Sequence, residues 1–369
     1  MLNIVCDKNK LTNGIGIVLK AIPAHSTMTI LECMVLDAHE GKIHLVSNDL
    51  EIGIETIIEG EIKEEGSVAV NAKVISEIIR KMPDFPISIQ VDDNYTIHIT
   101  CGKSKFDIAG RSTEEFPFLP NIIKDTKVEV SQFTLKEIIR QTVFSISDND
   151  NNKLMTGELF EIEGDNFSVT SLDGHRISIR RVTLKKEYDH IKVVIPGKTL
   201  NEIIKILSGD MDEIVEMYFT DKHVMFSFND TIVLSRLIEG EYYKIEQMLS
   251  SDYETKLSID KKDFLNSIER AVLLVKENDK KPVIMDIKDD YLNLSLKTMI
   301  GSMNEDIDIT KEGKDIMIGF NPKFLIDALR VIEDEKVDIY MINPKAPCFL
   351  KNEDETYIYL ILPVNFNVD

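Results

Sequence analysis

The stretch VIPGKTLNEIIKIL, from Val194 to Leu207, contains the pattern on which the rest of the chain is built. A short apolar run stops at Pro196-Gly197, and Lys198 then opens a segment with apolar residues at helical spacing: Leu200, Ile203, Ile204 and Leu207. The same phrase recurs in SVAVNAKVISEIIRKM around Lys73 and in DIMIGFNPKFLIDALRVI around Lys323. Both steps between these lysines are 125 residues. Three copies at one spacing predict a repeat architecture.

The patterns around each copy predict the fold class. Each repeat reads as a strand, a helix, several strands, the repeated helix and further strands, with hairpin turns such as Asp92-Asp93-Asn94 and Gly102-Lys103. Hairpins without regular β–α–β alternation favour antiparallel sheets with two helices on one face of each repeat. We therefore expect an α+β chain of three repeated domains, at 1–125, 126–252 and 253–369.

Composition favours a globular chain without a membrane anchor. Hydrophobic residues make up 43% and charged residues 29% of the 369 residues. No apolar run approaches the roughly 20 residues of a membrane span, and the N-terminus shows no apolar signal core. The cysteines lie far apart without a CxxC pair, so we expect buried thiols in a cytoplasmic protein: Cys6, Cys33, Cys101 and Cys348.

The net charge of −21 hides a division between elements. Taken alone, it argues against a nucleic-acid partner, because the field of the whole molecule repels phosphate. The six expected helical segments nevertheless all lean positive and together carry +9, so the remainder carries −30. Any one such helix is ordinary, since amphipathic helices show lysines to water. Six of six indicate one basic surface on an acidic body.

A geometric estimate connects this surface with DNA. Two identical chains would supply twelve helices, and laid side by side at about 9–10 Å their axes form a ring about 35 Å across. Removing a helix radius on each side leaves a bore of roughly 25–28 Å, wider than a DNA duplex. A ring that encircles DNA does not need strong binding, which would reconcile the acidic net charge with a DNA partner.

Motifs in a fixed order along the chain resemble one family. SNDLE (Ser47–Glu51), EEFPFLP (Glu114–Pro120), LDGHRIS (Leu172–Ser178) and LILPV (Leu360–Val364) are similar to segments of the bacterial sliding clamps, the beta subunits of DNA polymerase III. The DGHR segment is the strongest single match. With the three repeats, the resemblance covers essentially the whole chain.

The resemblance implies a fold and a function. It implies the DNA clamp fold, with two chains forming a closed head-to-tail ring that slides on duplex DNA regardless of sequence. Such a processivity factor tethers the replicative polymerase through its alpha subunit, and it binds the clamp loader, other polymerases and repair factors through short peptide motifs. It implies neither a cofactor nor a catalytic site. The alternative from another class is an acidic peptide-binding scaffold that does not encircle DNA.

The resemblance also assigns a peptide pocket between the second and third domains. Its apolar members suit burial of leucine or phenylalanine anchors from an extended peptide. Carried over by position, the pocket would contain Met155, Leu172, Gly174, His175, Arg176, Ile177, Tyr243, Gln247, Met248, Pro347, Leu360, Leu362, Pro363 and Val364.

Two further sets of residues are expected at surfaces. The cations of the helical segments, with a histidine near the pore mouth, are expected to face DNA: Lys10, Lys20, His25, Lys73, Arg80, Lys136, Arg140, Lys198, Lys205, Lys262, Arg270, Lys323 and Arg330. In the family an edge strand of domain one pairs with domain three of the other chain. This implies a dimer interface at Phe106, Ile108, Leu273 and Leu274, although the leucines are equally compatible with an ordinary core.

The chain departs from the family pattern at several of these positions. Tyr243 stands where the family often has proline, and neutral residues stand where it has basic ones, at Asn152, Gln247 and Asn365. These changes affect the expected peptide preference. His25 and Gly197 replace arginines near the pore, which weakens the expectation of DNA contact there.

Catalytic and metal sites find little support. Asp173 and His175 suggest a carboxylate-oriented histidine, but no serine or cysteine nucleophile in a strained turn accompanies them. The histidines show no HxH or HExxH spacing, which argues against a metal site. There is no GxxxxGK[ST] phosphate loop, so the ATP used to load a ring would belong to another protein.

Overall fold

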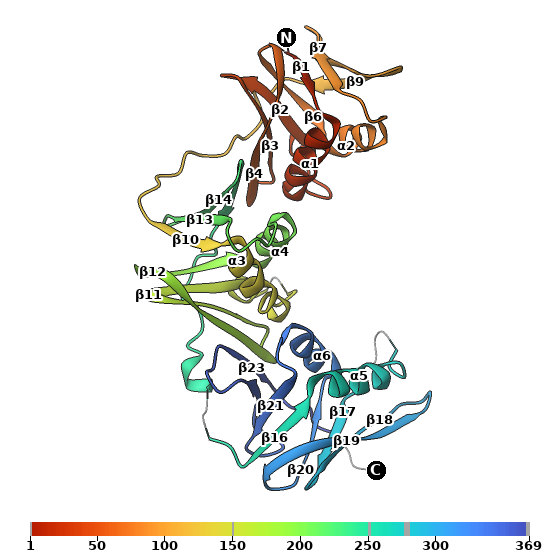
Figure 1. Ribbon diagram of the computed structural model, residues 1–369, viewed down its shortest axis with the longest axis vertical. Coiled ribbons are helices and arrows are strands. Elements are labelled where there is room, and N and C mark those ends of the chain that lie inside the picture. The colour runs from red at the N-terminus through yellow and green to blue at the C-terminus, as the bar shows by residue number, and fades with distance from the viewer. Residues whose placement is uncertain (1, 150, 250–251, 277–280, 367–369) are drawn as a thin grey trace. The chain divides into compact units, whose positions relative to one another are not determined.

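The computed structural model describes residues 2–149, 151–249, 252–276 and 281–366. The chain forms two compact units, each built on one antiparallel sheet (Figure 1). Unit 1 comprises Met1–Lys136 and Lys198–Leu237, and unit 2 comprises Glu137–Gly197 and Ile238–Asp369. These units do not coincide with the three predicted domains, because each sheet runs across a junction between two repeats. The predicted domain boundaries therefore stay a prediction.

Unit 1 contains a 13-stranded sheet with helices α1 (Lys8–Val18) and α2 (Ala72–Lys81) packed side by side against it (Figure 1). Short 3-10 turns follow α1 at Leu19–Ala21 and Thr29–Glu32. The strands, in sheet order, are β10 (Lys127–Ser131), β13 (Ile214–Phe219), β14 (His223–Phe228), β15 (Thr231–Arg236), β4 (Ile52–Ile58), β3 (Lys42–Asn48), β2 (Cys33–His39), β6 (Gly66–Asn71), β9 (Ser104–Arg111), β8 (Thr96–Cys101), β7 (Ile87–Val91), β1 (Leu2–Cys6) and β5 (Gly60–Glu64).

Unit 2 contains a 10-stranded sheet and the packed helix pair α5 (Lys261–Val272) and α6 (Pro322–Val331). Short 3-10 turns are η3 (Val143–Ser145), η4 (Lys153–Thr156) and η5 (Glu246–Met248). The strands, in sheet order, are β11 (Gly157–Leu172), β12 (Arg176–Pro196), β23 (Tyr357–Ile361), β22 (Cys348–Lys351), β21 (Lys336–Met341), β16 (Thr255–Asp260), β19 (Ser302–Gly313), β18 (Tyr291–Lys297), β17 (Val283–Ile287) and β20 (Ile316–Phe320).

The remaining two helices, α3 (Gln132–Arg140) and α4 (Gly197–Ile206), each contain residues of both units. The spacing of Leu135, Ile138, Ile139 and Thr142 in FTLKEIIRQTVFSI predicts a helix from Phe133 to Ile146, but α3 ends at Arg140 and Thr142 lies beyond its end. There the Thr142 hydroxyl donates to the carbonyl of Ile138 at 2.8 Å, a local bond that competes with helix propagation.

Helix starts follow the local sequence. Asp7, Asn71, Asp260 and Asn321 precede α1, α2, α5 and α6, and each side chain accepts a hydrogen bond from a first-turn N–H. Pro322 occupies the first turn of α6, where its missing N–H costs nothing. The repeated phrase quoted above therefore encodes a strand end, a cap and a helix in the first and third copies.

In each sheet, one pair of strands joins two neighbouring repeats, and we call this pair a joint. In unit 1, β4 pairs antiparallel with β15, with Ile54 opposite Val233. In unit 2, β12 pairs antiparallel with β23, with Ser178 opposite Tyr359. Each joint thus uses the strand that follows a four-residue turn in one repeat and the last strand of the next repeat's sheet. Mostly antiparallel sheets were predicted, and the observed pairings confirm them.

All four cysteines are buried free thiols, as the sequence predicted. Burial, with the nearby Asp7 carboxylate, raises the pKa of Cys6 to about 12, and burial also raises the pKa of Cys348. Since the thiolate is the reactive form, these cysteines are poor nucleophiles.

One acidic side chain, Glu158 on β11, is fully buried. Neither of its carboxyl oxygens has a hydrogen-bond partner among the described residues. Burial raises the pKa of Glu158 well above its usual value, and the nearby Thr142 offsets only part of this effect. In the folded state the protonated form is therefore favoured.

Replacing Glu158 by glutamine is expected to stabilise the protein at neutral and alkaline pH. A raised folded-state pKa makes the wild type most stable below the ordinary glutamate pKa, and stability falls as pH rises towards the folded-state value. The expected gain is about 1–2 kcal/mol at pH 8 and less at pH 5, the scale of an unpaired buried polar group. Urea unfolding from pH 5 to 8 measures it, with exposed Glu163→Gln on the same strand as control. Equal pH dependence of wild type and Glu158→Gln would contradict the expectation.

Candidate functional site

An apolar floor in unit 2 contains or contacts five of the fourteen residues predicted for peptide binding. Leu172 ends β11, Ile177 is the second residue of β12 and Leu360 lies on β23, and all three are buried in one cluster with Tyr242 and Ile245. Met155 and Tyr243 pack against this cluster. Strand alternation places Ile358 and Leu360 in this cluster and their neighbours Tyr357, Tyr359 and Ile361 in the core of the third repeat.

The turn between β11 and β12 is held by its aspartate. The Asp173 carboxylate accepts hydrogen bonds from the backbone N–H groups of His175 (2.9 Å) and Arg176 (3.1 Å). Gly174 has a φ of +87°, which favours glycine. Asp173 therefore shapes a turn rather than orienting the His175 ring. His175 is exposed, and its carbonyl accepts from the N–H of Leu362, which brings the C-terminal segment to the turn.

Arg176 is the best-connected side chain of this region and is only 7% exposed. Its Nε donates to Asp173 (3.0 Å), its Nη1 to Asp327 on α6 (2.7 Å), and its Nη2 to the carbonyl of Phe144. The guanidinium also lies over the rings of Phe144 (5.3 Å) and Phe324 (4.6 Å). The side chain predicted to touch a peptide thus binds the turn to helix α6.

The remaining predicted pocket residues lie on three segments. Met155 belongs to η4, and Gln247 and Met248 to η5, where both side chains are exposed. Pro347 directly precedes β22, which contributes Phe349 to the apolar floor. After β23, Leu362, Pro363 and Val364 are half-buried or exposed, and the Val364 N–H donates to the carbonyl of Gly319 (2.8 Å).

Three family models, all for the DNA polymerase III beta subunit, match this chain in succession. The N-terminal domain matches residues 2–120, the central domain 129–244 and the C-terminal domain 246–365. The chain is 32% identical over 375 residues to the beta sliding clamp of Staphylococcus epidermidis, covering 99% of both chains.

This chain belongs to the bacterial sliding clamp family.

Solved clamp structures have the same fold. The DNA polymerase III beta subunit of Eubacterium rectale is 58% identical, with a TM-score of 0.96 over 99% of this chain and 100% of that chain. The Bacillus subtilis sliding clamp is 30% identical, with a TM-score of 0.95 over 99% and 100%. The three-domain α+β clamp fold predicted from the sequence is therefore confirmed, as is the family itself.

The thirteen residues predicted to face DNA fall into three groups. Six form ion pairs with carboxylates: Lys10 with Glu59, Arg140 with Glu137, Lys198 with Asp49, Lys205 with Glu202, Arg270 with Glu305 and Arg330 with Glu269. Lys73 donates to the carbonyl of Ala24 and Lys136 to that of Leu207. For Lys20, Arg80, Lys262 and Lys323 the structure shows no ion pair within the described ranges, and exposed His25 lies next to Ala24.

The cations in these ion pairs remain exposed to solvent. The Lys10–Glu59 and Arg330–Glu269 pairs are exposed on both sides, at 52%/85% and 61%/39%, and exposed pairs of this kind contribute little stability. The Lys198–Asp49 pair differs, because Lys198 is 57% exposed but Asp49 only 6%. The pairing reduces the excess positive charge that the sequence predicted for the helical segments.

The predicted interface residues differ in exposure. Phe106 on β9 is 44% exposed, and Leu273, just after α5, is 81% exposed. Ile108 and Leu274 are half-buried, and Leu274 packs against the core of the third repeat. Leu273 therefore does not belong to the core of its own chain.

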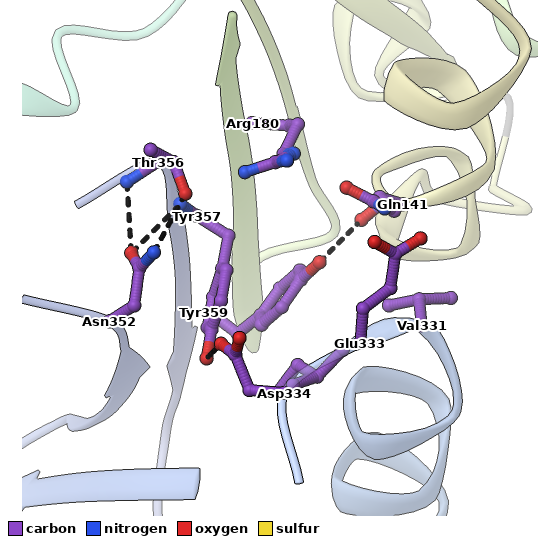
Figure 2. A pocket seen from close by; sticks show the side chains of 10 residues that line it. Gln141, Arg180, Val331, Glu333, Asp334, Asn352, Thr356, Tyr357 and Tyr359 are labelled. Carbon is purple, nitrogen blue, oxygen red and sulfur yellow. Dashed lines mark hydrogen bonds between the residues drawn. The ribbon is translucent and has the colours of Figure 1, made fainter. Parts of the chain in front are cut away.

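The sequence did not indicate a polar pocket of about 70 Å³ on the other side of β23. Figure 2 shows Tyr357 and Tyr359 of β23 beside Gln141, which follows α3, and Glu333 and Asp334, which follow α6. Tyr359 donates to the Gln141 carbonyl (3.1 Å) and Tyr357 to Asp334 (2.8 Å). The Arg180 Nη1 is buried without a partner among the described residues. Cation and anions line it together, so no single ligand charge is favoured.

Sequence reasoning also missed the partners of Arg176, which are Phe144, Phe324 and Asp327. Asp327 carried a signal, since it is the acidic residue of the otherwise basic α6. Its partner lies 151 positions away in the chain, so only the folded structure identifies the pair. No group of three or more metal-binding side chains occurs within the described residues, and none of the described helices is long and apolar enough to span a membrane.

Proposed function

We propose that two copies of this chain close head to tail into a ring around duplex DNA and act as a DNA polymerase processivity factor. The ring would slide without reading sequence and would hold the replicative polymerase through the peptide site. It would act as an accessory subunit, with the chemistry supplied by its partners. The clamp family membership carries this proposal, and the strand edges described next support ring closure.

Both internal joints leave an equivalent pair of strand edges unused. The hairpin β18–β19 has a four-residue turn between Lys297 and Ser302, like the turns that precede the joint strands β4 and β12. The hairpin β8–β9 has the same two-residue turn as β14–β15. Within the described residues, the Ser104–Ala109 part of β9 pairs with β8 alone and the Ser302–Asp308 part of β19 with β18 alone. In a ring of two copies, β9 of one chain would pair antiparallel with β19 of the other, as β15 pairs with β4 and β23 with β12 within the chain.

The internal joints also predict the register of the missing one. Aligning the hairpin turns makes Phe106 equivalent to Val233 and Met303 equivalent to Ile54, which face each other at the first joint. Phe106 of one chain is therefore expected opposite Met303 of the other. Val233 and its counterpart Tyr359 are 0% and 2% exposed, whereas Phe106 is 44% exposed. The difference is the apolar surface that a partner would cover.

The charges of the two edges are complementary. The β9 hairpin presents Lys103 and Lys105, and the β19 edge presents Glu305 and Asp306. In the expected register Lys105 lies opposite Asn304 and diagonal to Asp306, and Lys103 lies opposite Asp306. Such pairs fix the register and disfavour pairing of like edges.

Retention on DNA of defined topology tests the function. After loading onto nicked circular plasmid by a clamp loader with ATP, the protein is expected to stay bound at about 0.5 M salt, where phosphate contacts are screened. Cutting the plasmid once should release it, because a ring slides off a free end. Gel filtration of the DNA fraction before and after cutting measures this, with bound protein counted by a label.

The same experiment separates the scaffold alternative. Equal retention before and after cutting, or no retention on circles at all, would overturn encirclement. A scaffold that only binds peptides would show no dependence on DNA topology.

A further inference from the structure

A side-chain contact joins two segments that border the apolar floor. We call these segments its walls: the segment from Asn152 to Met155 is one, and Tyr242 with Tyr243 is the other. The Nδ2 of Asn152, just before η4, donates to the hydroxyl of Tyr243. These residues are 91 positions apart, and Tyr243 and the neighbour of Asn152 in η4, Met155, both pack against the cluster that contains Leu172 and Leu360.

Each partner of this contact is fixed to its own wall. The Met155 N–H donates to the Asn152 carbonyl (3.1 Å), and the Ser147 N–H donates to the Met155 carbonyl (2.7 Å), so Asn152 moves with Met155. On the other side the Tyr243 ring meets Tyr242 edge to face at 5.9 Å. Tyr242 is 4% exposed, and its hydroxyl donates to the Thr170 carbonyl (3.4 Å). Both walls are therefore anchored in the floor.

We propose that Asn152 and Tyr243 form a latch that closes the peptide site of this chain and sets its affinity and selectivity. The inference rests on the proposed function, because it concerns the same site. In this proposal an extended peptide with apolar anchors reaches Leu172 and Leu360 between the two walls, so the latch opens before the peptide is seated. The apparent affinity is then the intrinsic affinity multiplied by the fraction of molecules in which the latch is open.

The latch also restricts which peptides bind well. Opening the latch breaks the hydrogen bond between the Asn152 amide and the Tyr243 hydroxyl. A peptide that offers polar backbone or side-chain groups at this point gives both groups new hydrogen-bond partners. A peptide that presents only apolar atoms there leaves them unpaired and binds more weakly.

Removing the hydroxyl tests the latch. Tyr243→Phe retains the ring and its packing and is expected to bind tighter, by about two- to tenfold, the range that one neutral hydrogen bond allows. The gain should appear as a faster association rate. The probe is a fluorescein-labelled synthetic peptide of alternating leucine and serine ending in Leu-Phe, followed by stopped-flow anisotropy with the full-length dimer.

Two further variants keep the test interpretable. Asn152→Ala should give the same gain, and the double variant should give no more than either alone, since both remove one contact. Tyr291→Phe, a tyrosine 39% exposed on β18, is the matched control and should leave binding unchanged. Equal or weaker binding by Tyr243→Phe, or additive gains, would overturn the latch. Failure of wild type and all variants to bind would overturn the peptide site itself, and the latch with it.

Discussion

Exchanging Phe106 for aspartate is expected to convert the proposed dimer into monomers and to abolish the proposed retention on circular DNA. The position equivalent to Phe106 is buried at both internal joints, so the new carboxylate would be desolvated opposite Met303 of the partner. It would also lie diagonal to Glu305 of the acidic β19 edge, on the same face of the sheet. An unpaired charge in such a place costs about 2–5 kcal/mol at each joint, and a closed ring has two joints.

Sedimentation at micromolar concentration measures this change as a halving of mass. The control is Ile214→Asp, the same kind of exchange at a 41% exposed strand position whose strand is paired on both sides. The control should stay dimeric. A dimeric mass for Phe106→Asp would contradict the joint.

The register itself has a covalent test. Cysteines at positions 106 and 303 should form an intermolecular disulfide under mild oxidation, because directly opposite residues are close enough for this bond. Cysteines at 106 and 305 lie diagonally and should not form it. The native cysteines are buried and should not compete. A disulfide between positions 106 and 305 alone would mean that the two joints within the chain do not predict the register of the joint between two chains.

Removing Arg176 is expected to be the most destabilising single change in unit 2. Arg176→Met leaves the Asp173 and Asp327 carboxylates without their cation, at 15% and 19% side-chain exposure. Truncation of one partner in a buried ion network costs about 3–5 kcal/mol. The same variant should lose peptide affinity, because the turn that holds Gly174 and His175 is no longer fixed to α6.

Thermal unfolding and peptide titration measure the two effects. Adding Asp327→Asn to Arg176→Met should recover part of the stability, since it removes the unpaired charge. Arg236→Met, at an exposed position in unit 1, is the control and should change little. A stability loss below about 1 kcal/mol for Arg176→Met would show that the network is an ordinary surface ion pair.

Local patterns in the sequence predicted the elements well because their causes are local. The helical spacing behind Lys73, Lys198 and Lys323, and the caps at Asn71 and Asn321, act within one turn of chain. Alternation also contained a signal that was not used. In ELFEIEG, Glu158 shares a strand face with Phe160 and Ile162, which are both 0% exposed, so its burial was predictable.

Side-chain roles at the site were less predictable because they depend on distant partners. Arg176 was expected to contact a peptide, but its exposure is decided by Asp327 and Phe324, which the fold brings from another repeat. The same holds for the contact between Asn152 and Tyr243. No local pattern indicates which tyrosine meets which amide across an apolar cluster.

By itself, the sequence determined the repeat, the antiparallel α+β class, the helix positions and the family, since periodicity, capping and motif order are properties of the chain. Only the tertiary structure decided how strands of different repeats pair, and it left one edge of β9 and one of β19 unpaired. It also decided that half of the expected DNA-facing cations are paired with carboxylates. The reason is that the pairing of strands such as β4 and β15, and ion pairs such as Lys198–Asp49, join residues far apart in the chain, which local spacing does not encode. Among the ion pairs of these cations, only the Arg140–Glu137 and Lys205–Glu202 pairs lie within one helical turn.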